Sequence, residues 1–331
     1  MHGQFAWHEL TTSDPAAAQK FYKTFTGWGS QPFDADYSLL TSGGVPVAGV
    51  FQLTDEMRSH GIPPNWMPYV EANNVADTAK LAESLGARIM YGPTTIPNVG
   101  DIAVIQDPQG AVFGIYKSTS GAQSWDGTPV VGKFSWNELM STDHAKAFDF
   151  YRRLFGWERI NEMDMGDGQM YLLFGKGGAM YGGMFTRFGD MAQMHPFWLC
   201  YIHVRDVPKS LATATKSGAI VHRPPMEVPG GVIAILGDPQ GAGFALHHQS
   251  VSASVSGKTL ATAKKSKAVA KSSGRKKKGA KKPVAKSSGR KKKGAKKSVA
   301  KSSRVKVKKA AAKGGKKKSA SRRPARRAKK K

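Results

Sequence analysis

The chain has 331 residues, and its charge is divided sharply between two regions. Residues 251–331 hold 34 of the 51 Lys and Arg and none of the 23 Asp and Glu, which leaves the first 250 residues with a net charge of −6. Those last 81 residues contain no aromatic side chain, so they cannot build a hydrophobic core. The first 250 have room for one large or two ordinary domains.

Several classes of protein are excluded by simple features. A single cysteine, Cys200, rules out an intramolecular disulfide. The sequence has no apolar run of about 18 residues that would predict a membrane span, and the N-terminus lacks the charged and apolar segments of a secretory signal. We therefore expect a cytoplasmic protein.

The sequence repeats itself at an offset of 129 residues. The segment from Phe5 reads FAWHELTTSDPAAAQKFYKTFTGW and matches FSWNELMSTDHAKAFDFYRRLFGW from Phe134. A second match joins GARIMYGPTTIPNVGDIAVIQDPQGAVFGIY to GAIVHRPPMEVPGGVIAILGDPQGAGFALHH. We predict two copies of one domain, at 1–119 and 130–249, joined by a linker at 120–129.

The pattern of apolar residues in the first copy predicts a strand from Phe5 to Leu10, then a helix with Asp14 as its N-cap and Pro15 at its first position. A second helix follows Asn74 and ends at Gly86. The remaining predicted strands lie near Tyr37–Leu40, Val45–Phe51, Met67–Ala72, Arg88–Tyr91, Asp101–Gln106 and Val112–Tyr116. The unit is β-α-β-β-β, and we expect it four times in the two copies. The Asp-Pro-Gln-Gly segments at Asp107 and Asp238 are typical of turns.

Four motifs point to a known family: F-x-W-x-E-L, S-D or T-D at the helix start, F-Y-x-x-x-x-G-W at the helix end, and D-P-Q-G-A before the last strand. They resemble the glyoxalase, bleomycin-resistance and extradiol dioxygenase superfamily, also called vicinal oxygen chelate proteins. The tandem form resembles a branch labelled both glyoxalase-like and hydroxylase. The resemblance implies an α+β fold of tandem glyoxalase-like domains built from four βαβββ modules, with sheets that curl around an open cleft.

The resemblance also implies a divalent metal held by His or Glu from the first and fourth strands of each module. The matching positions here are Trp7, Met67 and Gly114, and in the second copy Trp136, Leu199 and Ala245. The remaining ligand would come from Val45–Phe51 or Ala179–Phe185, and neither stretch contains His, Asp, Glu or Cys. We therefore expect no metal and no other cofactor.

One displaced metal site stays open. Glu138, His203 and His247 share strand parity with the vacated positions and would supply two histidines and a carboxylate. Their equivalents in the first copy are Glu9, Glu71 and Tyr116, so such a site would exist only once. The alternative is that these histidines belong to the rim and surface.

The predicted cleft offers aromatic surface instead, because alternate residues of a strand face the same side. On this parity we predict ligand-binding residues Trp7, Met67, Tyr69, Tyr116, Trp136, Leu199, Tyr201 and His247. Glu9 and Glu138 are the paired carboxylates on that face and are candidate catalytic bases. The alternative is that Trp7 and Trp136 merely plug the cleft.

The tail repeats AKSSGRKKKGAKK every 15 residues, from Ala270 and again from Ala285. In composition it resembles the basic tails of linker histones and of some bacterial nucleoid proteins. We expect residues 250–331 to be disordered in isolation and to bind DNA or RNA independently of sequence, by releasing counterions. The residues expected to contact nucleic acid are Lys271, Arg275, Lys276, Lys277, Lys278, Lys286, Arg290, Lys291, Lys292, Lys293, Arg322, Arg323, Arg326 and Arg327. A solubility tail and a membrane tether are the alternatives, and no amphipathic or lipidated anchor supports the latter.

The sequence therefore predicts a metal-independent glyoxalase-fold protein that binds a small organic ligand and is tethered to the nucleoid by its tail. Two alternatives remain: a lyase or oxidoreductase of the superfamily, and an architectural nucleoid protein whose folded part is not catalytic. The protein is expected to be a monomer with pseudo-dimeric domains or a homodimer.

Overall fold

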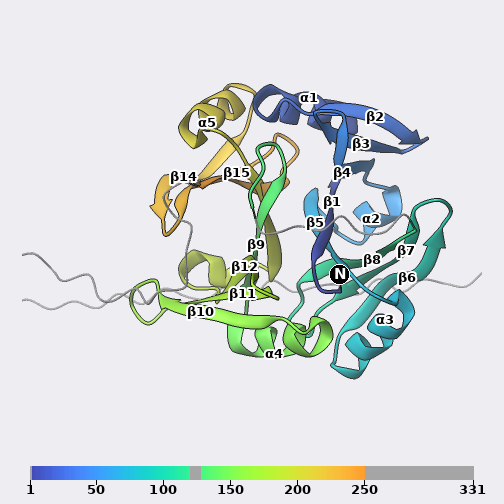
Figure 1. Ribbon diagram of the computed structural model, residues 1–331. Helices are drawn as coiled ribbons and strands as arrows, with labels where there is room; N and C mark the ends of the chain where they lie inside the picture. The colour runs from blue at the N-terminus through green and yellow to red at the C-terminus, as the bar shows by residue number, and fades with distance from the viewer. Residues whose placement is uncertain (1, 120–127, 250–331) are drawn as a thin grey trace, which may run out of the picture. The chain divides into compact units, whose positions relative to one another are not determined.

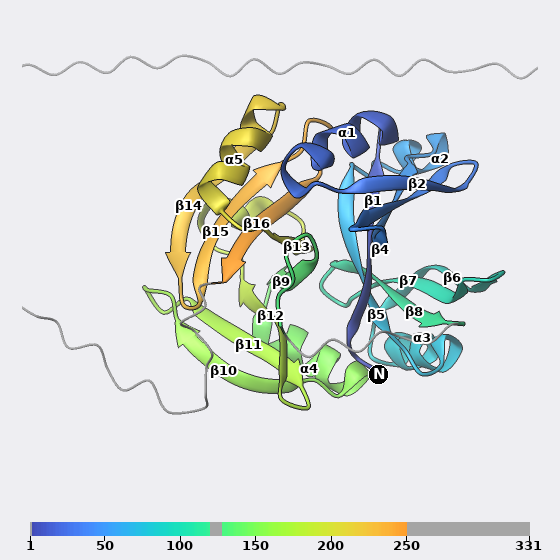
Figure 2. The ribbon, with the colours of Figure 1, turned by 45° about the horizontal axis from the view of Figure 1, so that its top comes forward.

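The computed structural model describes residues 2–119 and 128–249. The tail, with every nucleic-acid-binding residue named above, and most of the predicted linker lie outside them. The described residues form two eight-stranded sheets, one from each copy of the repeat, as Figures 1 and 2 show. This confirms the α+β tandem fold that the repeat predicts. No helix within 2–119 or 128–249 is long and apolar enough to cross a membrane.

The first sheet has the strand order β2-β3-β4-β1-β5-β8-β7-β6, so the strands that open the two modules lie side by side at its centre. Strands β1 and β5 are antiparallel, whereas β1 runs parallel to β4 and β5 runs parallel to β8. The strands are β1 (Phe5–Thr12), β2 (Gly29–Asp34), β3 (Tyr37–Ser42), β4 (Val45–Gln52), β5 (Asn65–Glu71), β6 (Arg88–Ile96), β7 (Gly100–Gln106) and β8 (Val112–Ser118). The helices are α1 (Pro15–Thr26), α2 (Asp55–Ser59) and α3 (Val75–Ser84).

The second sheet repeats this topology in the order β10-β11-β12-β9-β13-β16-β15-β14. Its strands are β9 (Phe134–Ser141), β10 (Glu158–Asp164), β11 (Met170–Lys176), β12 (Ala179–Thr186), β13 (Phe197–His203), β14 (Ile220–Val228), β15 (Gly231–Gly237) and β16 (Gly243–Gln249). The helices are α4 (His144–Phe155), the short 3-10 helix η1 (Gly189–Gln193) and α5 (Val207–Lys216).

The helix ends follow the predicted signals. The Asp14 carboxylate accepts the backbone N–H of Ala17 at 2.9 Å, with Pro15 directly after it, and Gly27 ends α1 in the left-handed conformation at φ 75°. Asn74 caps α3 by accepting the N–H of Asp77. The cap satisfies an N–H that has no partner within the helix, and glycine adopts the positive φ without a steric penalty.

The sequence analysis missed strand β2, and with it β10 in the second copy. The β2 segment, GSQPFD, contains Pro32 and has hardly any buried residue. An edge strand that faces solvent on both sides lacks the alternation of apolar and polar residues by which strands are recognised. The short helices α2 and η1 were not predicted either.

The two larger hydrophobic cores of the described residues are each shared by both copies. One joins α3, β7 and β8 to α4, β11 and β12, and the other joins α1, β3 and β4 to α5, β15 and β16. Figures 1 and 2 show α1 beside α5. Phe113 and Ile115, predicted to face the helices, are at most 1% exposed, and the Phe113 ring lies 5.3 Å from that of Tyr151 in the other copy. Each of these two cores therefore needs residues from both copies.

The Gly-Trp motif at each helix end links the two copies. The Trp28 indole N–H donates to the Gly132 carbonyl at 2.8 Å, and the Trp157 indole N–H donates to the Gly3 carbonyl at 2.6 Å. Trp28 and Trp157 are both 1% exposed. These signatures therefore stabilise the contact between copies.

The predicted Asp-Pro-Gln-Gly turns are present and also link the copies. The N–H of Gly110 closes the first turn onto the Asp107 carbonyl, and Gly241 does the same with Asp238. The Tyr151 hydroxyl donates to Asp107 at 3.0 Å, and the Tyr22 hydroxyl donates to Asp238 at 3.1 Å. Burial raises the pKa of both carboxyls, and the hydrogen bonds from the turn oppose that shift.

His8 and Asn137 occupy equivalent positions of the repeat and pair directly with each other. The His8 Nε2 atom lies 2.9 Å from the Asn137 side-chain oxygen, and the His8 ring stacks on Phe134 at 3.8 Å. His8 is only 6% exposed, and this burial lowers its pKa to about 4. The folded state therefore holds His8 in its neutral form.

We expect this histidine to make folding sensitive to acid. The pKa of His8 falls from 6.5 to about 4 on folding, so the unfolded chain binds a proton more readily than the folded protein between these pH values. The free energy of unfolding is therefore highest above pH 6.5 and decreases as the pH falls toward 4. The loss amounts to roughly 3 kcal/mol. Denaturant unfolding at pH 7 and pH 4.5 should show a smaller decrease for His8→Gln, which cannot titrate, than for the natural protein. Equal decreases in the two proteins would contradict this assignment.

Candidate functional site

The centre of the first sheet carries a linked set of four side chains on its inner face, the face opposite the helices. The Tyr37 hydroxyl donates to Glu9 Oε2 and the Tyr69 hydroxyl donates to Glu9 Oε1, both at 3.0 Å. The Trp7 indole N–H donates in turn to the Tyr37 hydroxyl at 3.1 Å. Three strands, β1, β3 and β5, thus converge on one carboxylate.

The second sheet repeats the set. Tyr171 donates to Glu138 Oε2 at 2.7 Å, Tyr201 donates to Glu138 Oε1 at 3.0 Å, and the Trp136 indole donates to the Tyr171 hydroxyl at 3.0 Å. The sequence analysis placed Trp7, Glu9 and Tyr69 on the inner face of the first copy, and the structure brings these three together. It does the same with Trp136, Glu138 and Tyr201 in the second copy. We call each group a Glu–Tyr–Tyr–Trp set.

Tyr37 and Tyr171 are the members that the sequence analysis missed. Each lies two strands away from its glutamate, with β4 or β12 between, so strand parity alone gives no sign that it reaches across. The internal repeat holds a usable signal, because both copies have a tyrosine at this position, in YSLL and YLLF.

Two glycines allow those tyrosines to reach the carboxylates. Gly49 pairs with Glu9 between β4 and β1, and Gly183 pairs with Glu138 between β12 and β9. A Cβ atom built on Gly49 would overlap the Tyr37 hydroxyl, and one on Gly183 would overlap the hydroxyl of Tyr171. The tyrosine side chain thus passes over the glycine to its neighbouring strand.

The electrostatics of both sets keep the tyrosines protonated. Burial raises the pKa of Glu9 and of Glu138, while the hydrogen bonds from the tyrosines act in the opposite direction. Burial and the neighbouring carboxylate raise the pKa of Tyr69, Tyr171 and Tyr201 well above its usual value. The hydroxyls therefore remain donors at any physiological pH, and the carboxylates are the groups able to accept a proton.

The other predicted ligand-binding residues lie around the sets without joining them. The Tyr116 hydroxyl donates to the Val99 carbonyl at 3.2 Å. His247 Nδ1 lies 2.9 Å from the Ser135 hydroxyl, and the His247 ring lies 6.4 Å from that of Tyr201. Met67 is partly exposed, whereas Leu199 is 1% exposed. Burial lowers the pKa of His247 to about 4.

The inner faces do not fit the divalent ion that the family resemblance implies. Within residues 2–119 and 128–249 no group of three or more His, Cys, Asp or Glu is placed to hold a metal, and this includes the displaced set of Glu138, His203 and His247. Each glutamate oxygen already accepts a tyrosine hydroxyl. Trp7, at the position of a metal ligand in the family, offers only an indole N–H, which donates and cannot coordinate.

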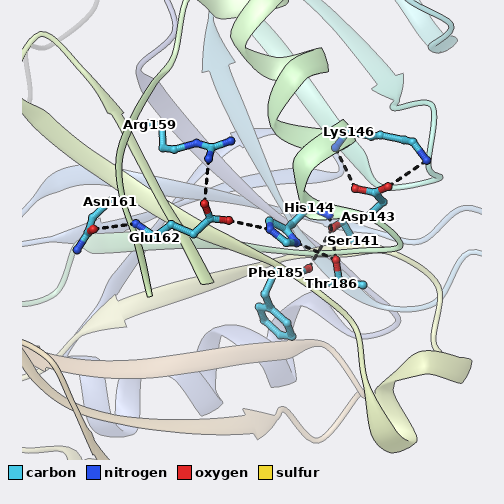
Figure 3. Close-up of polar contacts among 9 residues, drawn as sticks. All are labelled: Ser141, Asp143, His144, Lys146, Arg159, Asn161, Glu162, Phe185 and Thr186. Atoms are coloured by element: carbon cyan, nitrogen blue, oxygen red, sulfur yellow. Dashed lines mark hydrogen bonds and ion pairs between the residues drawn. The ribbon is translucent and has the colours of Figure 1, made fainter. Parts of the chain in front are cut away.

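A separate polar cluster lies where α4 begins (Figure 3). His144 Nδ1 lies 2.9 Å from the Thr186 hydroxyl and Nε2 lies 3.0 Å from Glu162 Oε1, while Arg159 donates to Glu162 Oε2 at 2.9 Å. The backbone N–H of His144 donates to the same Thr186 hydroxyl at 3.0 Å. The first copy has Pro15 at the matching position. The hydrogen bonds of His144 connect β10 and β12 to the start of α4. We therefore interpret the cluster as structural.

The paired eight-stranded sheets and their duplicated modules define a tandem glyoxalase-like fold. Residues 133–246 match the Glyoxalase/Bleomycin resistance protein/Dioxygenase superfamily. The chain is 30% identical over 248 residues to "Putative glyoxylase CFP32" of Mycobacterium tuberculosis, a match that covers 72% of this chain and 92% of the relative. It is 29% identical over 261 residues to "Anthracycline biosynthesis protein DauV" of a Streptomyces species, covering 74% and 92%. The chain therefore belongs to the glyoxalase, bleomycin-resistance and dioxygenase superfamily.

Solved structures share the fold at low sequence identity. A substrate complex of homoprotocatechuate 2,3-dioxygenase from Brevibacterium fuscum, which contains 3,4-dihydroxyphenylacetate, is 13% identical with a TM-score of 0.52, covering 75% of this chain and 82% of that one. An Mn(II)-bound glyoxalase from Novosphingobium aromaticivorans is 14% identical with a TM-score of 0.50 and the same coverage. These similarities show the fold alone.

Proposed function

We propose that the folded part of this protein binds a small organic ligand on the inner face of its sheets without a metal ion, and that the basic tail holds it on nucleic acid. The observation that carries the first statement is the duplicated Glu–Tyr–Tyr–Trp set. It places a hydrogen-bonded carboxylate among aromatic side chains at the centre of each sheet, where the superfamily resemblance implies a metal centre. An apolar surface with a few convergent polar groups is what a small-molecule site requires.

The nature of the relatives supports an aromatic ligand. One of them is named for anthracycline biosynthesis. In the present chain Trp7, Tyr37 and Phe51 supply aromatic surface near Glu9, with the Tyr37 and Phe51 rings 6.4 Å apart and 18° from parallel. Such rings contact a planar ligand through dispersion and quadrupole interactions.

A second candidate function is proton transfer, as in a lyase or oxidoreductase of the superfamily. The raised pKa of Glu9 and Glu138 favours it, because a carboxyl that titrates closer to neutral pH is a better general base or acid. The two tyrosine donors would hold the carboxylate in one orientation. Binding and proton transfer would use the same residues.

Calorimetric titration of the full chain with 2-naphthol tests the proposed binding. We expect binding by protein dialysed against EDTA, with no stoichiometric metal in elemental analysis. The double variant Gly49→Ala/Gly183→Ala should bind at least about tenfold more weakly, since the added methyl groups displace two tyrosine hydroxyls from the carboxylates. Gly243→Ala is the matched control, because a Cβ there meets no atom within 4 Å.

Three results would count against the proposal. They are the absence of measurable binding by the natural protein, binding that returns only when a metal is added back, and unchanged affinity in the folded double variant.

A further inference from the structure

We propose that only the first copy is a ligand site, that it takes a neutral planar aromatic molecule with a hydroxyl donor, such as a phenol or enol, and that side chains of the protein fill the equivalent place in the second copy. This inference rests on the proposed function and specifies which of the two Glu–Tyr–Tyr–Trp sets performs it.

The inner face of the second sheet is packed by its own residues. Met140, Phe185, Leu199, Tyr201 and Ala245 form a buried apolar cluster there, each at most 5% exposed. Met191 of η1 and Phe197 of β13 pack against this cluster. Tyr201, which binds Glu138, belongs to this cluster, and Tyr171 packs against it, so the second set is part of a hydrophobic core.

The first sheet has smaller or more polar residues at the positions that fill the second. Thr11 pairs with Asn65 between β1 and β5, where the second copy pairs Met140 with Phe197 between β9 and β13. Gly114 pairs with Tyr69 where Ala245 pairs with Tyr201. At these positions the first copy lacks the methionine, the phenylalanine and the alanine methyl group that the second copy has. Less side-chain volume therefore covers the first set.

The glutamates of the two sets differ in exposure, whereas Trp7 and Trp136 are both partly exposed. Glu138 is 8% exposed and Leu199 is 1% exposed, whereas Glu9 and Met67 are both partly exposed. Glu9 is therefore the less covered of the two glutamates.

The chemistry of the first set selects the ligand. Each Glu9 oxygen accepts one tyrosine hydroxyl, and a carboxylate has about four acceptor positions, so Glu9 is able to accept a further O–H. The negative charge opposes an anionic ligand. Trp7, Tyr37 and Phe51 supply flat apolar contacts. A neutral aromatic hydroxyl compound satisfies all three conditions.

The test measures both stoichiometry and ligand preference by titrating the full chain with three probes. We expect 2-naphthol to bind with one molecule per chain. The probe 2-methoxynaphthalene, which cannot donate, and 2-naphthoate, which is anionic, should bind about tenfold or more weakly, as expected for the loss of a hydrogen bond to a charged group.

Two variants then locate the site. Asn65→Phe, which introduces the residue found in the second copy, should weaken 2-naphthol binding at least about tenfold. Met140→Leu/Phe197→Leu, which keeps the second face filled, should leave affinity and stoichiometry unchanged. Asn65 is partly exposed, so the larger side chain is compatible with folding, and near-ultraviolet circular dichroism checks this.

The failures of the two proposals are distinguishable. No binding of 2-naphthol to the natural protein removes the proposed function and this inference with it. Three other results would overturn only the inference that the first copy is the single ligand site. They are two molecules bound per chain, full binding by folded Asn65→Phe, and loss of binding in Met140→Leu/Phe197→Leu. If 2-methoxynaphthalene binds as tightly as 2-naphthol, the proposal that the ligand donates a hydroxyl hydrogen bond to Glu9 is wrong.

Discussion

Removal of residues 250–331 should abolish measurable binding to duplex DNA. The last 81 residues carry a net charge of +34, whereas the first 250 carry −6, so the folded part should be repelled by a polyanion. Affinity of the full chain should fall by ~10³ to 10⁵ between 50 and 200 mM salt if 6 to 10 phosphates are engaged. Fluorescence anisotropy with labelled duplexes of unrelated sequence measures both effects.

A tail of scrambled sequence and constant composition provides the control for this prediction. It should bind DNA with nearly the same affinity, because counterion release depends on charge and not on the order of residues. If scrambling abolishes binding, the 15-residue repeat is a structured recognition element. If the truncated protein keeps its affinity, the tail is not the binding region.

Trp157→Ala should destabilise both copies of the repeat together, by about 3 to 5 kcal/mol. Trp157 is 1% exposed, its ring lies 4.3 Å from Phe174, and its indole N–H donates to Gly3 of the first copy. Since the two larger cores each draw on both copies, loss of this side chain should lower the stability of both copies in one common unfolding transition. Differential scanning calorimetry and hydrogen exchange of β8 and β16 amides measure it.

Trp28→Ala, the equivalent change in the first copy, should give an effect of similar size. Phe33→Ala is the exposed control, since Phe33 is 52% exposed and should cost less than about 0.5 kcal/mol. Two separate transitions, with β8 protection unchanged in Trp157→Ala, would show that the copies unfold independently.

Comparison of the sequence with the structure shows which features local patterns encode. The caps at Asp14 and Asn74 and the faces of Trp7, Glu9 and Phe113 were predictable, because capping and strand alternation are local. The inner-face sets were predictable only in part. Tyr37 and Tyr171 reach across an intervening strand, and that reach depends on two glycines whose importance appears only once the register is known.

The pairing of helices with sheets was also beyond local patterns. The apolar face of α1 shows that the helix packs on something, but it does not say that its partner is α5 of the other copy. Likewise, the sequence analysis treated Trp7 and Trp136 as equivalent. The residues that distinguish the two inner faces, such as Asn65 and Phe197, lie on other strands.

The cores that both copies share also constrain when the protein is able to fold during synthesis. The Phe25 ring of α1 stacks on Phe244, 5.8 Å away, so this contact joins residues more than 200 positions apart in the chain. While the ribosome extends the chain, α1 can pack only on strands of its own copy until α5 and β16 have emerged. Contacts of such long range are slow to form, and apolar surface that stays exposed meanwhile favours aggregation. The highly charged segment follows β16 in the chain. It therefore emerges from the ribosome after all the strands and helices of both sheets have been synthesised.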